Sequence, residues 1–317
     1  MAGEAMAHIL TIGGAYWARV AAGMLRRAGF DAAFWQARPA DVPVALRWWR
    51  PLRAAGYYLR QPFRGASVVH GVSPTGCLVP LRAARLLGKR VVCHWIGTDV
   101  SELAEGARRG DLRPARLMRR LADAHFADSP EMVAELAQLG IEAEVFRLLP
   151  DTILPAAEVP MPEKPAVLCY WARGRRAFYH GEIVDALAAE FPEVAFLVVG
   201  TDGAGEPEHP NVRYLGRLDG LDGVYRQVSV LLRMPDHDSL SAMVLEALAR
   251  GRWVIYNRPL PHVEQASNLA EARDALRQCL GKRGPDAAGR EYVAREFSPA
   301  RECERVAPLY RRAIGQL

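Results

Sequence analysis

An α/β protein of two open parallel sheets is predicted by three features of this sequence. Short apolar runs, many of them β-branched, alternate with amphipathic stretches of helical period, and several of those stretches end at a glycine. A proline-rich stretch at residues 149–165 interrupts the alternation, which then starts again. Alternation of this kind is typical of βαβ units in parallel sheets. The 317 residues are enough for two domains, which we expect at 1–149 and 150–298.

The first half contains five apolar runs that we expect to be strands. They cover residues 8–12, 32–35, 67–70, 90–95 and 124–127. The helix after the first of these strands is expected to end at Gly29 in a left-handed cap, and two later helices are expected to end at Gly88 and Gly140. Ser129 and Pro130 suit the N-cap and the first position of the last of these helices.

The second half repeats the pattern. Strands are expected at 167–171, 195–199, 212–215, 230–232 and 253–256, and helices at 182–190, 222–228 and 242–250. Gly251 would cap the last of these helices, and a final helix covers about 299–314. Ligands of open parallel sheets bind beyond the carboxyl ends of the strands. Two such edges facing each other would form a cleft, which a proline-rich hinge would allow to close.

The most informative segment, residues 236–251, leads from a strand through a polar loop into a helix. Ser241 suits the N-cap, and the backbone N–H groups around Ala242 and Met243 would carry the positive end of the helix dipole, which favours a diphosphate. Glu246 follows one turn later among apolar neighbours. The helical pattern alone favours a solvent-facing Glu246 over one that turns into the cleft toward ribose hydroxyls.

Several motifs follow one another in a particular order along the chain. Asp238 and Glu246 have seven residues between them, and Gly251 and a strand come next. Residues 174–181 have the spacing G-R-x4-H-G. This order resembles the E-x7-E and G-R-x4-K-G motifs of the retaining glycosyltransferases with the GT-B fold, and weaker matches extend over nearly the whole chain. The resemblance implies two Rossmann-like domains, the nucleotide-sugar donor in the second, the acceptor in the first, and a final helix, 299–317, returning to the first.

The resemblance also implies a role for each matching residue of the second domain. Arg175 would contact the donor diphosphate, with Arg173 as an alternative contact. His180 stands where the family has a phosphate-binding lysine. Asp238 stands where the family's first glutamate contacts the transferred sugar, and Glu246 would bind the ribose of the nucleotide.

Three residues of the first domain have implied roles near the donor. Gly13 and Gly14 would allow the loop after the first strand to approach it, because glycine has no side chain in the way. His94 would lie beside the reacting sugar. A strand-end histidine bonded to backbone is an equally favoured interpretation of His94.

The resemblance implies a hexosyltransferase-type reaction that retains the anomeric configuration and uses no metal and no cofactor besides the nucleotide-sugar substrate. Arginine and a helix tip stabilise the charge that grows on a departing diphosphate, which makes such a reaction physically coherent. His237, between Asp236 and Asp238, suggests a metal site. Adjacent loop residues that bond one another are nevertheless the favoured interpretation.

Two departures from the family pattern keep a second function open. The lysine of the motif is His180 here, and the first glutamate is Asp238. We favour a distinct donor preference as the reason, and a non-catalytic GT-B binding subunit is the alternative. A nicotinamide-dependent enzyme is disfavoured because neither domain has G-x-G-x-x-G after its first strand.

Composition limits the partners. The 41 basic and 36 acidic residues give a net charge of +5, which suits an anionic ligand or surface without implying nucleic acid. Five scattered cysteines with no CxxC pair predict reduced thiols in a cytoplasmic protein. The sequence shows neither a signal peptide pattern nor an apolar run of membrane-spanning length.

Two basic stretches lie in the first domain. Residues 48–60 combine tryptophans, tyrosines and arginines, and residues 108–120 contain six arginines. Solvated faces are the favoured interpretation. The alternative is peripheral contact with the inner face of a membrane, with a lipid-linked acceptor in place of a free carbohydrate.

Overall fold

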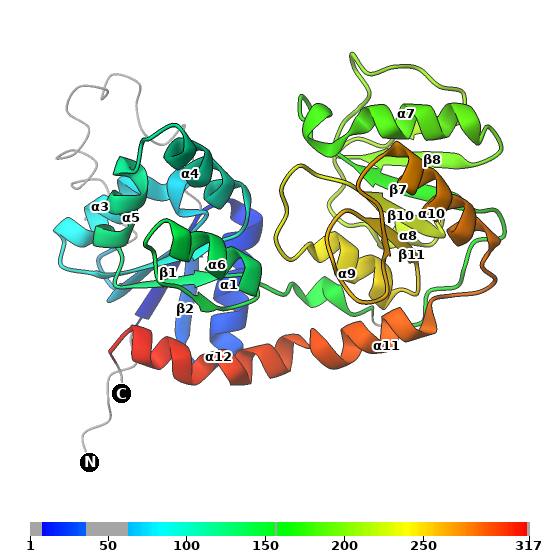
Figure 1. Cartoon of the computed structure of the whole chain (residues 1–317). Coiled ribbons are helices and arrows are strands. Elements are labelled where there is room, and N and C mark those ends of the chain that lie inside the picture. The colour runs from blue at the N-terminus through cyan, green and yellow to red at the C-terminus, as the bar shows by residue number, and fades with distance from the viewer. Residues whose placement is uncertain (1–7, 36–62, 156, 316–317) are drawn as a thin grey trace. The chain divides into compact units, whose positions relative to one another are not determined.

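The computed structural model describes residues 8–35, 63–155 and 157–315, which form two compact units (Figure 1). The first unit consists of Met1–Pro150 and Pro299–Leu317, and the second of Asp151–Ser298. Each is built around one parallel sheet of six strands. The predicted α/β class with two parallel sheets is therefore confirmed.

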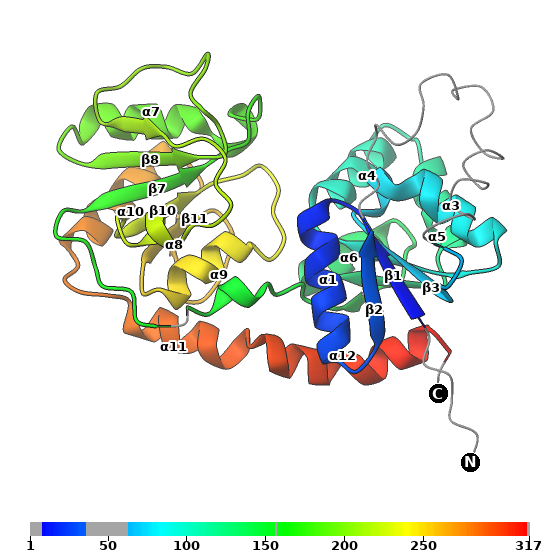
Figure 2. The same cartoon turned by 180° about the vertical axis from the view of Figure 1, so that it is seen from behind.

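The sheet of the first unit has the order β2-β1-β3-β4-β5-β6, with every neighbouring pair parallel. Its strands are β1 (His8–Ile12), β2 (Asp31–Trp35), β3 (Val68–Val72), β4 (Arg90–Trp95), β5 (Ala124–Ala127) and β6 (Glu144–Val145). Its helices are α1 (Ala15–Arg27), α3 (Leu78–Leu86), α4 (Thr98–Arg108), α5 (Arg113–Leu121), α6 (Pro130–Gln138) and α12 (Pro299–Ala313), with the 3-10 helix η3 (Pro74–Cys77) before α3. Figure 2 shows this unit from behind, with β1, β2 and α1 in front.

The sheet of the second unit has the order β12-β11-β10-β7-β8-β9, again with all pairs parallel. Its strands are β7 (Ala166–Tyr170), β8 (Ala195–Val199), β9 (Val212–Tyr214), β10 (Val230–Arg233), β11 (Trp253–Tyr256) and β12 (Glu264–Gln265). Its helices are α7 (Gly181–Glu190), α8 (Asp222–Tyr225), α9 (Ala242–Ala249), α10 (Leu269–Gly281) and α11 (Ala287–Glu296), with the 3-10 helices η4 (Asp151–Ile153) and η5 (Ala177–Tyr179).

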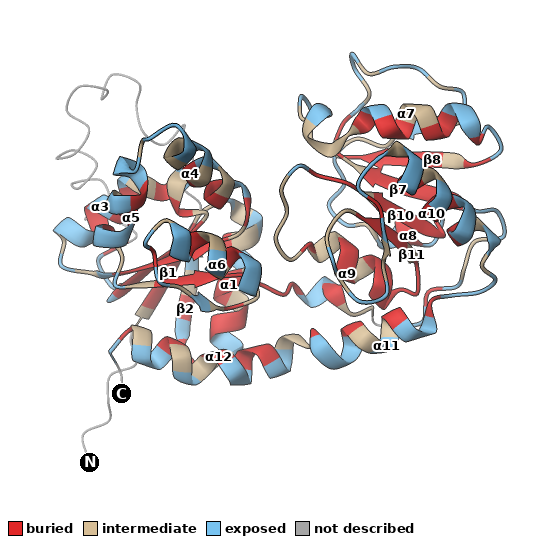
Figure 3. Cartoon of the chain, in the orientation of Figure 1, coloured by how far each residue is buried: buried red, intermediate tan, exposed pale blue. Residues whose placement is uncertain are grey.

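Both sheets are covered by helices, so most strand residues are buried (Figure 3). This arrangement explains why the strands read as continuous apolar runs rather than as alternating ones. Trp95 in the first core and Trp171 in the second are among the largest fully buried side chains. Each unit therefore has a hydrophobic core of its own.

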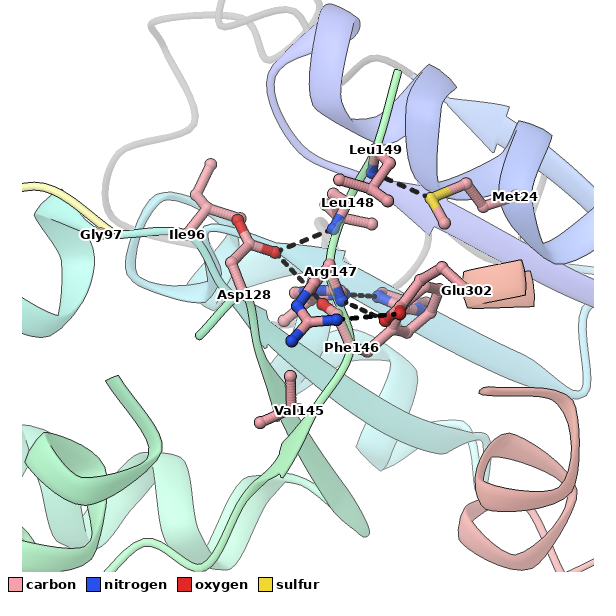
Figure 4. Close-up of polar contacts among 12 residues, drawn as sticks. Met24, Ile96, Gly97, Asp128, Val145, Phe146, Arg147, Leu148, Leu149 and Glu302 are labelled. Atoms are coloured by element: carbon pink, nitrogen blue, oxygen red, sulfur yellow. Dashed lines mark hydrogen bonds and ion pairs between the residues drawn. The ribbon is translucent and has the colours of Figure 1, made fainter. Parts of the chain in front are cut away.

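The last helix is anchored to the first unit by a buried carboxylate. Glu302 of α12 is 4% exposed and accepts a hydrogen bond from the backbone N–H of Arg147 at 2.8 Å (Figure 4). The Arg147 guanidinium lies 3.6 Å from the same carboxylate. Helix α12 also packs against α1.

The predicted helix ends are confirmed where glycine or a cap residue marks them. Gly29 and Gly251 have φ angles of 87° and 68°, which glycine adopts without strain. Ser129 accepts a hydrogen bond from the backbone of Met132 as the N-cap of α6.

Some elements differ from the expectation. The edge strands β6 and β12 have two residues each, too few to leave a pattern in the sequence. The helix expected at 222–228 is the single turn α8, which contains the poor helix former Gly223.

Candidate active site

Each sheet contains a point at which the strand order reverses. In the first unit the chain goes from β1 to β2 on one side and continues with β3 on the other. In the second it goes from β7 to β8 and β9 and then continues with β10 on the other side of β7. Ligands of open α/β sheets bind outside the carboxyl ends of the strands at this switch point. The loops after β1, β3, β7 and β10 are therefore the places to look for a site.

Asp238, in the loop between β10 and α9, is held at the switch point of the second unit by two side chains. Arg233, the last residue of β10, donates from Nε to Asp238 Oδ2 at 2.7 Å, and the Tyr256 hydroxyl donates to the same oxygen at 3.0 Å. Burial alone would lower the pKa of Arg233, but the Asp238 carboxylate raises it overall. Asp238 is thus a fixed carboxylate in a neutralised pair. Neither partner belongs to a motif that the sequence displays.

Glu246 is half-buried in α9, and its carboxylate accepts two hydrogen bonds. Thr152 Oγ1 donates to Oε1 at 2.7 Å, and the Tyr225 hydroxyl donates to Oε2 at 3.3 Å. Burial raises the pKa of Glu246, although the Thr152 hydrogen bond and the Arg250 charge act in the opposite direction. Glu246 is therefore a bonded, half-buried residue and not the solvated one that the helical pattern alone favoured.

Arg250 fixes the surroundings of Glu246. Its buried guanidinium lies 2.6 Å from Asp222 Oδ1 and donates to the backbone oxygens of Thr152, at 2.9 Å, and Ile153, at 3.2 Å. The segment η4 is thereby tied to the end of α9, which places the Thr152 hydroxyl on Glu246. Arg250 is a positioning residue that sequence reasoning did not identify.

The N-terminus of α9 is capped as predicted. The buried Ser241 hydroxyl accepts a hydrogen bond from the backbone N–H of Val244 at 3.4 Å. The first N–H groups of a helix have no acceptor within the helix. Those of Ala242 and Met243 belong to this first turn and carry the positive end of the helix dipole.

The loop between β7 and α7 contains the three predicted phosphate contacts. The Arg175 guanidinium stacks on Phe178, 4.2 Å from the ring centroid. Arg173 lies 3.6 Å from Asp202, and both side chains are exposed, so this pair adds little stability.

His180 occupies a left-handed backbone conformation directly before α7, with φ of 51°. Its Nδ1 lies 2.9 Å from Glu182 Oε1, and its Nε2 lies 2.9 Å from Asp236 Oδ1. Each ring nitrogen therefore faces a carboxylate. His180 must give up one of these two contacts before it can bind a phosphate.

The loop after β1 forms the switch point of the first unit. Gly13 has φ of 148°, and a Cβ there would lie 2.5 Å from the Val72 carbonyl oxygen at the end of β3. Gly14 has ordinary angles, φ of −58° and ψ of 133°, and a Cβ there would meet nothing within 4 Å. Gly13 is thus required by the packing of its own unit, whereas Gly14 leaves open space beside the loop.

Neither a family model nor a curated protein sequence matches this chain. Solved structures do match it over nearly its whole length. Sucrose-phosphate synthase from Thermosynechococcus elongatus has a TM-score of 0.76 at 16% identity, with 98% of this chain and 100% of the other covered. HepE from Anabaena, in complex with UDP and glucose, has a TM-score of 0.72 at 12% identity, with 96% and 99% covered. A glycosyltransferase from Rickettsia africae has a TM-score of 0.66 at 12% identity, with 99% and 100% covered.

The chain has the GT-B fold. The resemblance drawn from the motifs is thereby confirmed at the level of the fold.

His94 is placed differently from its implied role in a GT-B protein. It is fully buried in β4, and its Nε2 lies 2.8 Å from the Phe146 carbonyl oxygen and 3.1 Å from Asp128 Oδ1. Its Nδ1 lies 3.2 Å from Nε2 of His70, which is also fully buried. The expectation that His94 lies beside a reacting sugar does not fit this environment. The alternative, a strand-end histidine bonded to backbone, does.

The chain is described over the ranges 8–35, 63–155 and 157–315. Within them, no three or more His, Cys, Asp and Glu side chains are grouped so that they could hold a metal, and this includes His237 and its neighbours. Nor does any helix within them have the length and apolar character to cross a membrane. The five cysteines are buried, and none of them is part of a disulfide in the described residues.

One of the two basic stretches lies within the described residues. Residues 48–60 lie outside the described residues. The stretch 108–120 forms the end of α4 and most of α5, and its arginines are exposed.

Proposed function

We propose that this protein is a glycosyltransferase that moves a sugar from a nucleotide-sugar donor to an acceptor, with retention of configuration and without a metal ion. One observation carries the proposal. Two fixed carboxylates, Asp238 and Glu246, precede and follow the capped N-terminus of α9 along the chain, in the segment after β10 at the switch point of the second sheet. The HepE complex with UDP and glucose, which shares the fold, supports a nucleotide-sugar as the donor.

The site divides into parts that match the parts of such a donor. The α9 N-terminus, with Ala242 and Met243, and the Arg175 guanidinium would bind the diphosphate. Glu246 would accept hydrogen bonds from the ribose hydroxyls, and Asp238 from a hydroxyl of the transferred sugar.

The chemistry follows from where charge develops. In the transfer, the bond between the anomeric carbon and the diphosphate oxygen breaks, and a bond from that carbon to the acceptor oxygen forms. The released diphosphate oxygen takes up negative charge and can accept the proton of the acceptor hydroxyl. A helix tip and an arginine stabilise such growing charge without reorganising, which is the largest single contribution in many enzymes. These groups supply the positive charge that a metal would otherwise provide.

The donor assignment is tested by a thermal-shift panel of UDP, GDP, ADP and dTDP. A ligand at a hundred times its Kd stabilises the folded state by about 2.7 kcal/mol. We expect one nucleotide to raise the Tm of the wild type and to have no effect on Glu246→Ala. A shift by none of the four, or an equal shift in the variant, would contradict the assignment.

A non-catalytic binding subunit of the same fold is the second candidate. The observation in its favour is that His180 is engaged by Glu182 and Asp236, where the family motif has a lysine. Turnover of a nucleotide-sugar by the wild type that is lost in Arg175→Ala rules this candidate out. Nucleotide binding without turnover of any sugar donor, measured with carbohydrate and lipid-linked acceptors present, supports the non-catalytic candidate.

We also propose that the acceptor is presented at a membrane surface of the cytoplasmic side. Val79, Arg82 and Leu86 lie on one face of α3, where Val79 and Leu86 are 48% and 72% exposed. Helix α5 packs against α3 (Figure 1). Its residues Arg116 and Arg120 are exposed. Exposed apolar and basic side chains together favour an interface with anionic lipid.

A vesicle assay tests the surface of α3 and α5. We expect sedimentation with phosphatidylglycerol vesicles at low salt, loss of binding at high salt, and weaker binding of the double variant Arg116→Glu, Arg120→Glu. Equal binding to neutral and anionic vesicles, or none to either, would rule the membrane surface out.

A further inference from the structure

Ser73 has a backbone conformation that serine rarely adopts. Its φ of 55° and ψ of 70° lie in the left-handed region, where a residue with a side chain is strained and glycine is not. In the part of the chain that the structure describes, two other non-glycine residues have a positive φ, His180 and His262. Ser73 directly follows β3, and His180 follows β7, so both lie in loops at the switch points. Strain of this kind is concentrated at functional sites.

The backbone on both sides of Ser73 is fixed by its own unit. The N–H of Ser73 donates to the His94 carbonyl oxygen at 2.9 Å, and the carbonyl oxygen of Ser73 accepts from the Gly76 N–H at 3.1 Å. The preceding carbonyl, that of Val72, is the group for which Gly13 leaves room. The fold therefore requires the left-handed angles. It does not require a side chain there, because glycine would adopt the same angles without strain.

The Ser73 hydroxyl has no role in the fold. It caps no N–H group of η3, and it has no hydrogen-bond partner among the described residues. Ser73 is half-buried, and its hydroxyl is open to solvent, unlike the buried and unpaired Oδ2 of Asp99. A strained serine with an unused, accessible hydroxyl at a switch point indicates that this hydroxyl binds a ligand.

The surroundings of Ser73 favour a neutral ligand. Residues 73–76 contain two hydroxyl groups and no charge. Helix α4 packs against η3, and N–H groups at its start are already used, because Asp99 Oδ1 accepts from Gly97 at 3.0 Å and from Val100 at 3.1 Å. This helix start therefore has little to offer an anion such as the donor diphosphate. An uncharged hydroxyl group of an acceptor needs only a partner such as Ser73.

We propose that Ser73 binds the acceptor, and that its hydroxyl forms a hydrogen bond with a hydroxyl of a neutral glycoside. The inference rests on the proposed transfer reaction, which needs an acceptor oxygen, and it assigns a residue and a ligand class to the acceptor side. The hydroxyl is useful to the ligand, whereas the left-handed backbone is unfavourable for serine. Ser73 is therefore a position at which stability and function are opposed.

Two variants separate the strain from the hydroxyl. Ser73→Gly removes both, and it should raise the midpoint of urea denaturation because glycine adopts a φ of 55° without strain. Ser73→Ala removes the hydroxyl and keeps the strain, so its midpoint should stay close to that of the wild type. If Ser73→Gly is no more stable than Ser73→Ala, the backbone is not strained and the proposal is overturned.

Ligand binding is followed at the backbone amide of Gly76, an exposed residue of the same turn, in a ¹⁵N-labelled full chain without nucleotide. Gly76→Ala assigns this resonance, because a Cβ there would meet nothing within 4 Å. The probes are the methyl and octyl glycosides of glucose, galactose and N-acetylglucosamine. We expect at least one of them to shift the resonance saturably. Ser73→Ala and Ser73→Gly should both bind it about tenfold more weakly, because one hydrogen bond is lost.

Two controls make the result specific. Ser267→Ala, at an exposed serine of the second unit, should bind the glycoside like the wild type. Glu246→Ala should do so too, so a failure of the glycoside experiment is distinguishable from a failure of the nucleotide assignment. The proposal is overturned if no glycoside shifts the Gly76 amide, or if Ser73→Ala binds as tightly as Ser267→Ala. It is also overturned if Ser73→Ala weakens nucleotide binding instead, because Ser73 would then contact the donor.

Discussion

The two switch points of the molecule share a strand arrangement but differ in chemistry. At the switch point of the first unit, polar side chains contact one another. The Tyr310 hydroxyl lies 3.0 Å from His70 Nδ1, and His70 Nε2 lies 3.2 Å from His94 Nδ1. All three side chains are fully buried. Around that of the second unit, Arg233 and Asp238 form a charged pair at the strand ends. The same topology therefore holds a chain of buried polar side chains in one unit and the charged groups of the proposed donor site in the other.

The difference shows that a switch point alone does not define a site. In the first unit the loop after β1 has open space at Gly14, where a Cβ would meet nothing within 4 Å. The second unit also has the N-terminus of α9 and the carboxylates of Asp238 and Glu246 near its switch point. The comparison holds only if substitutions at the site of the second unit weaken ligand binding. Substitutions at the buried histidines of the first unit must instead lower the stability of the folded state.

The largest expected effect is that of Glu246→Ala. Its carboxylate would accept hydrogen bonds from the ribose, and charged hydrogen bonds contribute about 1.5–3 kcal/mol each. Two such bonds predict a loss of about a thousandfold in kcat/KM, or about 4 kcal/mol. Steady-state kinetics with the nucleotide-sugar selected by the thermal-shift panel measures it. Glu291→Ala, an exposed carboxylate on α11, is the matched control. Comparable kinetics in the two variants would remove Glu246 from the site.

Asp238→Asn comes next, because it leaves Arg233 without its counter-charge. The two side chains are 11% and 14% exposed, and breaking a buried pair by removing one partner costs about 3 kcal/mol or more. We expect a lower midpoint in urea denaturation together with lost turnover. The double variant Arg233→Met, Asp238→Asn should recover stability but not activity. Recovery of both would make the pair purely structural.

The histidines of the first unit should be visible in the pH dependence of stability. Burial lowers the pKa of His125 from 6.5 to about 4. Below pH 6.5 the unfolded chain takes up the proton and the folded chain does not, so the stabilisation present at neutral pH is lost as the pH falls. From pH 7 to pH 5, the wild type should lose about 2 kcal/mol more than His125→Gln. Urea denaturation at both values measures this, and parallel losses would show that His125 is not buried in the neutral form.

Much of the fold could be predicted because it is encoded locally. Ser241 and Gly251 mark the ends of α9, and the apolar runs mark the strands. The order of the strands is not local, since it depends on which β-strand pairs with which across the whole unit. The sequence therefore indicated two parallel sheets but not where the switch points lie.

The candidate site could be predicted only in part, for a similar reason. Asp238 and Glu246 are found by their spacing, whereas Thr152 and Arg233 act through contacts that the sequence does not display. The sequence contains one signal for Arg233, a charged residue at the end of an apolar run, because a charge in that position requires a partner if it is buried. His94 stayed open between two interpretations because a histidine at a strand end has the same sequence context whether it faces a ligand or the core.

The smallest expected effect, and the sharpest for the comparison, comes from the two neighbouring glycines. Gly13→Ala should destabilise the first unit, because its Cβ would lie 2.5 Å from the Val72 carbonyl oxygen. Gly14→Ser should not, because serine is a good N-cap for α1 and nothing lies within 4 Å of the new Cβ. If the donor approaches this loop, Gly14→Ser raises its Kd by up to about tenfold, or about 1.4 kcal/mol. Titration calorimetry with the selected nucleotide-sugar measures this. An unchanged Kd in a stable Gly14→Ser variant would mean that the donor does not contact the loop after β1 at Gly14.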